Sequence, residues 1–187
     1  MVDAGVFNIA QVNIAIPAAP VDSERLAGFM ALLDPVNGIA DGSPGFVWRL
    51  QTDDGNATGI RAFDDDRLIV NMSVWTSLEA LSDFVFRSDH LAVLRRRREW
   101  FERTGEAYLA LWWVPAGTIP TIADAEDRIA HVRAHGPTDY AFTFRQSFPA
   151  PTSPPPGGAG EGSSPPPGIP APEPETPAAA AAPPSGG

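Results

Sequence analysis

His90 is the residue of this chain whose type and surroundings best suit acid–base chemistry. It follows Ser88 and Asp89, two residue types that often begin helices, and the dipole at a helix N-terminus disfavours an imidazolium. A neutral imidazole can act as a general base or polarise a carbonyl group. We therefore take His90 as a candidate catalytic residue. The simpler alternative is a capping or surface histidine.

Asn71 is the second candidate catalytic residue. It lies four residues before Trp75 in a run that alternates like a strand, so both side chains are expected on one face of a sheet. An amide beside an indole could orient a small aromatic molecule. The alternative is an amide that pairs across strands next to a packing tryptophan.

Two histidines stand at a spacing that metal sites use. His131 and His135 are four residues apart, which places them on one face of a helix. Apart from Asp124, Asp127 and Asp139, no further ligands are obvious nearby. We expect no metal and no cofactor.

Four consecutive arginines, Arg95 to Arg98, are a separate feature. Successive residues on a helix point about 100° apart, so the four cannot all line one pocket. Glu99 and Glu102 at neighbouring turns favour surface ion pairs. One arginine, Arg95 or Arg98, is kept as a possible anion contact.

Composition excludes several classes of function. The chain has 187 residues, no cysteine and a net charge of −10, and it contains no phosphate-binding, zinc-protease or nucleophile-elbow motif. An acidic domain repels phosphate backbones, so nucleic acid is not an expected partner. No apolar run approaches the length of a membrane span, and no secretory signal is evident. We expect a soluble, cytoplasmic protein.

The elements that would position these residues alternate along the chain. Helix signals begin at Ser23, ending at Asp34-Pro35; at Ser77, with a restart near His90; and at Thr121, ending at Gly136. Strands are expected over residues 7–16, 46–51, 67–75, 108–114 and 141–148. The order is β-α-β-β-α-β with an added C-terminal helix and strand. It predicts an α+β fold of the ferredoxin-like, split βαβ type, with an antiparallel sheet and two helices on a single face. This domain covers residues 1–148, and the Pro/Gly/Ala-rich residues 149–187 are expected to form a disordered tail.

Strand alternation sorts the expected sheet into two faces. One face is apolar and suits the helices. The other carries polar and aromatic side chains: Gln11, Asn13, Asn71, Ser73 and Trp75. Two strands leave their phase open, so either Trp48 or Arg49, and either Trp112 or Trp113, joins the mixed face. We take Gln11, Asn13, Trp48, Arg49, Ser73, Trp75 and Trp112 as candidate ligand-binding residues.

Large aromatic side chains on a sheet face seek cover. A second subunit's sheet could provide that cover and close a cavity between the two sheets. We therefore expect a homodimer with a small-molecule ligand. A filled dimer interface and a solvated face are the alternatives.

Several long blocks of the chain resemble one bacterial family. The blocks are DPVNGIADGSPGFVWRLQ, FDDDRLIVNMSVWTSLEALSDFVFRSDHLAVLRRRREWF, LALWWVPAGTIPTIADAEDRI and HVRAHGPTDYAFTFRQSFPAP, and the family is that of domains of unknown function 3291 (DUF3291). The resemblance implies the dimeric α/β-barrel superfamily, which includes antibiotic-biosynthesis monooxygenases and haem-degrading enzymes. The spacing of Asn71 and Trp75 resembles that of cofactor-free, quinone-forming monooxygenases.

The haem-degrading branch fits less well. There a helical tryptophan and a later helical histidine act with an asparagine on the first strand. Asn13 is present here, but Phe84 stands at the tryptophan position and Leu94 or Arg95 at the histidine position. Tight haem binding is not expected. The resulting hypothesis is a small-molecule-pocket protein that acts as a cofactor-independent, monooxygenase-like enzyme on an aromatic or polycyclic metabolite. The alternative is a non-catalytic dimeric binding or scaffold protein.

Overall fold

The computed structural model describes residues 7–52, 55, 57–60, 62–63, 65 and 67–152. The chain divides after Pro154, and all the described residues belong to the first unit, Met1–Pro154. The predicted disordered tail lies outside the described residues beyond Thr152. No helix in the described part combines the length and apolar composition that crossing a bilayer requires.

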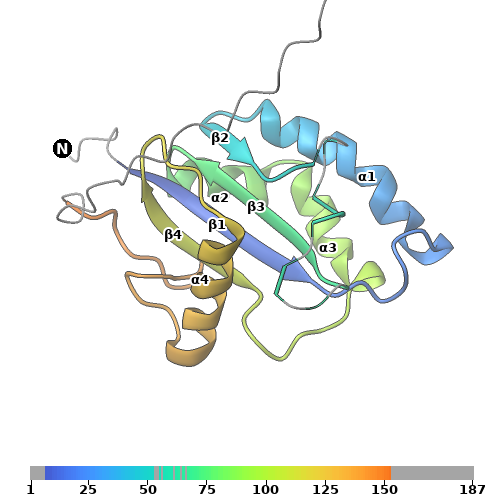
Figure 1. Ribbon diagram of the computed structural model, residues 1–187. Helices are drawn as coiled ribbons and strands as arrows, with labels where there is room; N and C mark the ends of the chain where they lie inside the picture. Colours follow the sequence, from blue (N-terminus) through green and yellow to red (C-terminus); the bar gives the residue numbers. More distant parts are fainter. Residues whose placement is uncertain are drawn as a thin grey trace, which may run out of the picture. The chain divides into compact units, whose positions relative to one another are not determined.

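One antiparallel sheet of four strands forms the centre of the first unit (Figure 1). The strands are β1 (Phe7–Ala15), β2 (Phe46–Arg49), β3 (Ile69–Trp75) and β4 (Leu109–Pro115), in the spatial order β2-β3-β1-β4. With one helix after β1 and a helix pair after β3, this is the ferredoxin-like arrangement, and the predicted fold class is confirmed. In the register, Asn13 lies between Asn71 on one side and Leu109 on the other.

The helices are α1 (Glu24–Asp41), α2 (Leu78–Arg87), α3 (His90–Trp100) and α4 (Ile122–His135). Ser77 caps α2 as predicted, because its side chain accepts the amide hydrogen of Ala80. The predicted break near His90 is confirmed as well, since the Ser88 hydroxyl accepts the amide hydrogen of His90 at 3.1 Å, where α3 begins.

The predicted end of α1 at Asp34-Pro35 is wrong, because the helix continues for two further turns to Asp41. Proline removes one helical hydrogen bond. Beyond Pro35, Val36 and Ala40 continue the apolar side of α1, and Ala40 is buried against the sheet. That burial favours continuing the helix.

The two faces of the sheet are covered in the opposite way to the prediction. The fully apolar face, which includes Val12, Met72 and Trp112, packs against α4 through Ile129 and Val132. Helices α1, α2 and α3 instead cover the mixed face that carries Gln11, Asn71 and Trp75. The sequence shows which side chains share a face but not which helix covers it, and here the added helix takes the apolar face.

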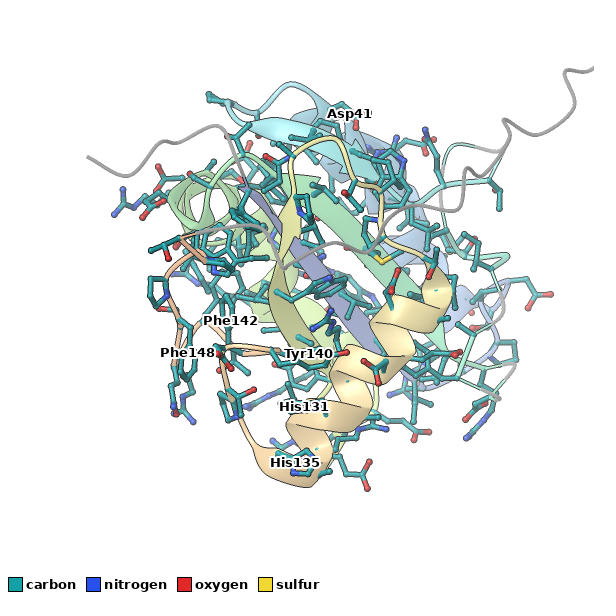
Figure 2. The ribbon with its side chains drawn as sticks, turned by 60° about the vertical axis from the view of Figure 1, so that its left-hand side comes forward. Asp41, His131, His135, Tyr140, Phe142 and Phe148 are labelled. Atoms are coloured by element: carbon teal, nitrogen blue, oxygen red, sulfur yellow. The ribbon has the colours of Figure 1, made fainter. Side chains whose placement is uncertain are left out.

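The predicted last strand, residues 141–148, is absent from the described sheet. Phe142 forms a single bridge with Leu111, exchanging two backbone hydrogen bonds of 2.8 Å. The chain then turns back on itself between Thr143 and Gln146. Phe142 is buried and packs against Phe148, and the two rings lie beside each other in Figure 2. The segment therefore contributes apolar packing rather than a fifth strand.

Candidate functional site

A cavity of about 280 Å³ lies between the mixed face of the sheet and helices α1, α2 and α3. Its volume is close to the lower end of the range for small-molecule sites. The walls are mainly apolar, with polar groups concentrated on the strands. Its lining includes most of the predicted site residues, namely Gln11, Asn13, Arg49, Asn71, Ser73, Trp75 and His90. These residues come together within one chain, and the predicted cover by a second subunit's sheet is not what encloses them.

Three amides form a connected chain on the floor of the cavity. Gln11 is only 5% exposed and donates from Nε2 to Asn71 Oδ1 at 2.8 Å. Asn13 Nδ2 lies 3.4 Å from Gln11 Oε1 and completes the chain. The Asn71 side chain is exposed to the cavity, and its Nδ2 group makes no hydrogen bond to any described residue. The floor therefore presents an amide donor to whatever occupies the cavity.

Trp75 forms one end of the cavity as part of an aromatic stack. Its ring is fully buried, lies 5.0 Å from the Phe84 ring in a stacked geometry, and donates from Nε1 to Ser73 Oγ at 2.9 Å. The Phe84 ring contacts the His90 ring at 4.8 Å. This packing holds the imidazole at the wall of the cavity and shields it from water.

His90 is held as a neutral imidazole with a defined tautomer. Its Nδ1 lies 3.3 Å from the carbonyl oxygen of Val85, so Nδ1 carries the hydrogen and donates it. Burial lowers the pKa of His90 below its ordinary value of 6.5, and the hydrogen bond to Val85 offsets this only in part. Nε2 keeps its lone pair and makes no hydrogen bond to a described residue. The ring is thus suited to accept a proton at Nε2.

Arg49 closes another side of the cavity, but its charge is already paired. It binds Asp41 through two nitrogens, at 2.8 and 3.1 Å, and donates to the carbonyl oxygen of Gly55 at 2.7 Å. It thereby ties the end of α1 to β2 and to the following loop. A structural role accounts for all of these contacts.

Some candidate residues lie away from the cavity. Trp48 and Trp112 point to the α4 face, because they pair in the register with Val74 and Ala10. The sequence left two choices open. The register shows that Arg49 and Trp113, rather than Trp48 and Trp112, lie on the mixed face. Trp113 donates to the carbonyl oxygen of Phe148 and does not line the cavity.

The paired histidines stand in the C-terminal half of α4 (Figure 2). Neither of them lines the cavity. The His131 ring lies 4.8 Å from that of His135, and its Nε2 is 2.8 Å from Thr138 Oγ1. No cluster of three or more metal-ligating side chains occurs among the residues that the structure describes.

Sequence reasoning missed the cavity residues of α3 beyond His90 and those at and just before the start of β4. Arg97 and Tyr108 line it, and the Arg97 guanidinium lies 4.3 Å from the centre of the Tyr108 ring. Arg95 and Arg98, the arginines kept as possible anion contacts, are exposed and lie outside the lining. Counting helical phase from His90 would have selected Arg97, because residue i+7 returns to within about 20° of residue i.

The fold and the cavity define a class: a ferredoxin-like α+β domain with a small-molecule-sized cavity between the sheet and the helices of one face. Within that class, the chain belongs to the family described as Domain of unknown function (DUF3291), whose model matches residues 8–156. Comparison with curated proteins finds no match.

Solved structures show only distant likeness. SnoaB, a cofactor-independent oxygenase from Streptomyces nogalater, is 17% identical with a TM-score of 0.38, covering 62% of this chain and 96% of its own. Rv0793 from Mycobacterium tuberculosis is 17% identical with a TM-score of 0.39, covering 61% and 99%. NE2512 from Nitrosomonas europaea, of unknown function, is 11% identical with a TM-score of 0.38, covering 62% and 96%. Similarity at this level carries no conclusion about activity.

Proposed function

We propose that the protein binds one small, largely apolar aromatic molecule in the cavity between its sheet and helices α1 to α3. The observation that carries the proposal is the placement of the amide chain and His90 in one mainly apolar cavity of about 280 Å³. Gln11, the buried amide beside Asn71, uses its side chain on its two neighbours. Asn71 leaves its donor directed to the cavity.

The lining of the cavity favours an aromatic or polycyclic ligand. Apolar side chains from three helices form its roof, and Phe84 and Trp75 form an aromatic end. Burial of apolar surface would supply most of the affinity, at about 25 cal/mol per Å². The Nδ2 group of Asn71 would fix the orientation of the ligand by donating a hydrogen bond to an oxygen atom of the ligand.

A second candidate function is catalysis. It is favoured by the neutral imidazole of His90 at the wall of the cavity. A neutral imidazole with a free Nε2 could remove a proton from a phenolic group at its end of the cavity, while Asn71 donates to another oxygen of the ligand. The spacing of Asn71 and Trp75, which resembles that of cofactor-free, quinone-forming monooxygenases, suggests cofactor-independent oxygenation. In such a reaction dioxygen converts a ring methylene to a carbonyl group, and the second oxygen atom leaves as water with the two hydrogens of that methylene.

Native mass spectrometry of the full chain tests the binding function. We expect a small molecule of one-to-one stoichiometry to co-purify, or 2-naphthamide to bind as a substitute. Leu94 lines the cavity from α3, so Leu94→Trp should fill it and abolish binding. A folded protein that binds neither a native molecule nor this probe would contradict the proposal. Oxygen uptake with a phenolic ligand, lost in His90→Ala, separates the enzyme from a binding protein.

The homodimer remains a prediction, but the burial of Trp75 within one chain removes one argument for it. It was expected because Trp75 would otherwise face water, yet Trp75 is 0% exposed within the single chain. Sedimentation at micromolar concentration tests the prediction directly. About twice the chain mass would support a dimer, and the mass of one chain would exclude the two-subunit barrel.

A further inference from the structure

Arg97 is a cation at the wall of a cavity that contains no acid. It lies seven residues after His90 on α3, which returns it to nearly the same side of the helix, about 10 Å further along the axis. Val93, Leu94 and Trp100 line the same stretch. No aspartate or glutamate occurs among the described residues that line the cavity. The cavity is therefore positive, although the whole chain carries a net charge of −10.

The charge of Arg97 is unpaired, unlike the charges of comparable arginines. Arg49, the other arginine of the lining, is neutralised by Asp41 at 2.8 Å. Arg96, its neighbour on α3, pairs with Glu99 at 2.9 Å. Arg97 forms no ion pair with any carboxylate in the described part of the chain, and its recorded side-chain contact is with the Tyr108 ring. That contact leaves the guanidinium donors free for a ligand in the cavity.

The strand register places a second donor near the same end of the cavity. Tyr108 directly precedes Leu109, which lies opposite Asn13, and Asn13 in turn lies opposite Asn71. The direction of the amide chain leaves Asn71 presenting its Nδ2 hydrogens. The cavity thus offers a cation and an amide donor at one end and an aromatic stack of Trp75 and Phe84 at the other.

We propose that the natural ligand is an aromatic carboxylate, bound with its carboxylate group at Arg97 and its ring system directed toward Trp75 and Phe84. This inference rests on the proposed function, because it names the class of molecule that the cavity accepts. Guanidinium binds a carboxylate through paired, charge-assisted hydrogen bonds. Arg97 is half-buried at the cavity wall, so an anionic ligand would give its charge a partner that the described residues do not supply.

Two matched probes test the inference by calorimetric titration of the full chain. 2-Naphthoate and 2-naphthamide share their ring system and differ in charge. We expect the wild type to prefer 2-naphthoate, and Arg97→Gln to reduce that preference roughly ten- to hundredfold with little change in binding of the amide. Arg97→Lys should retain part of the preference. Arg98→Gln, a neighbouring exposed arginine, is the matched control and should leave it unchanged.

Each other result counts against the inference in a recognisable way. Equal binding of the two probes, or a preference that survives in Arg97→Gln, would overturn the carboxylate assignment and leave the proposed binding function intact. Failure of both probes to bind the folded wild type would overturn the proposed function and the inference with it. Arg97→Met, which keeps an apolar stem against Tyr108, provides a second neutral variant in case Arg97→Gln does not fold.

Discussion

The two faces of the sheet are built from alternate residues of the same strands, yet one face forms a packed core and the other lines a cavity. The even-numbered residues, such as Val12, Met72 and Trp112, pack against α4 and are almost completely buried. The odd-numbered residues include Gln11 and Asn71, and the helices above them leave a cavity of about 280 Å³. A shift of one position along a strand exchanges a core residue for a cavity residue. Stability and binding can therefore be changed independently in this protein.

The largest expected effect is on the packed face. Trp112 is 1% exposed and lies in the apolar cluster with α4, so Trp112→Ala should lower the free energy of unfolding by about 3–5 kcal/mol. On the cavity face, Asn71→Leu should cost less, about 1–3 kcal/mol, because the Asn71 side chain is exposed and the main loss is the hydrogen-bond acceptor of the buried Gln11 Nε2. Urea unfolding of both variants measures the difference. Equal losses of unfolding free energy in the two variants would contradict this difference between the two faces.

The next effect is on the cavity face and concerns binding. Asn71→Leu removes the ligand's amide partner and leaves Gln11 Nε2 without its acceptor. We expect binding of 2-naphthamide to weaken by roughly 1–3 kcal/mol. Gln146→Leu, an exposed amide outside the cavity, is the control. A loss of stability as large as that of Trp112→Ala would instead assign Asn71 to the core.

The residues that begin the helices on the two faces should differ in their contribution to stability, by a smaller amount. Thr121 and Asp124 form a complete capping box at the start of α4, so Thr121→Ala should destabilise the protein by about 1 kcal/mol. Ser23 begins α1 on the cavity face, but its hydroxyl donates to the carbonyl oxygen of Pro20 and caps no helix amide. Ser23→Ala should cost less in the same thermal unfolding measurement. A larger cost at Ser23 would contradict the contrast.

The smallest expected effect is a pH dependence from His90. Its pKa is lowered in the folded state by burial, so the unfolded chain binds the proton more readily. The stability associated with the neutral ring is fully present above the ordinary pKa of 6.5 and is lost as pH falls through the lower, folded pKa. The wild type should therefore lose stability below about pH 6.5 relative to His90→Gln. Parallel pH profiles of the two proteins would show that the ring is not desolvated.

Local signals in the sequence predicted the elements well. Alternation over β3, the Ser77 cap and the restart at His90 are each decided by neighbouring residues, and all three are confirmed. The long-range choice of helix for each face was predicted wrongly, since it depends on whether α4 or the pair α2 and α3 reaches the apolar side. Dependence on long-range packing also explains why the sequence did not reveal Arg97 as a cavity residue. Its position follows from where α3 begins and from packing against Tyr108.

Pro35 divides α1 into two sections that need not open together. Because proline has no amide hydrogen, the carbonyl group of Ala31 lacks its usual helical donor. The section after Pro35 contributes Val36 and Ala40 to the cavity wall, and its last residue is tied to the sheet through Arg49. We expect amide hydrogens after Pro35 to exchange with solvent faster than those before it, as a separate cooperative unit. Transient opening of that section would give a ligand a route into the cavity while the sheet stays intact.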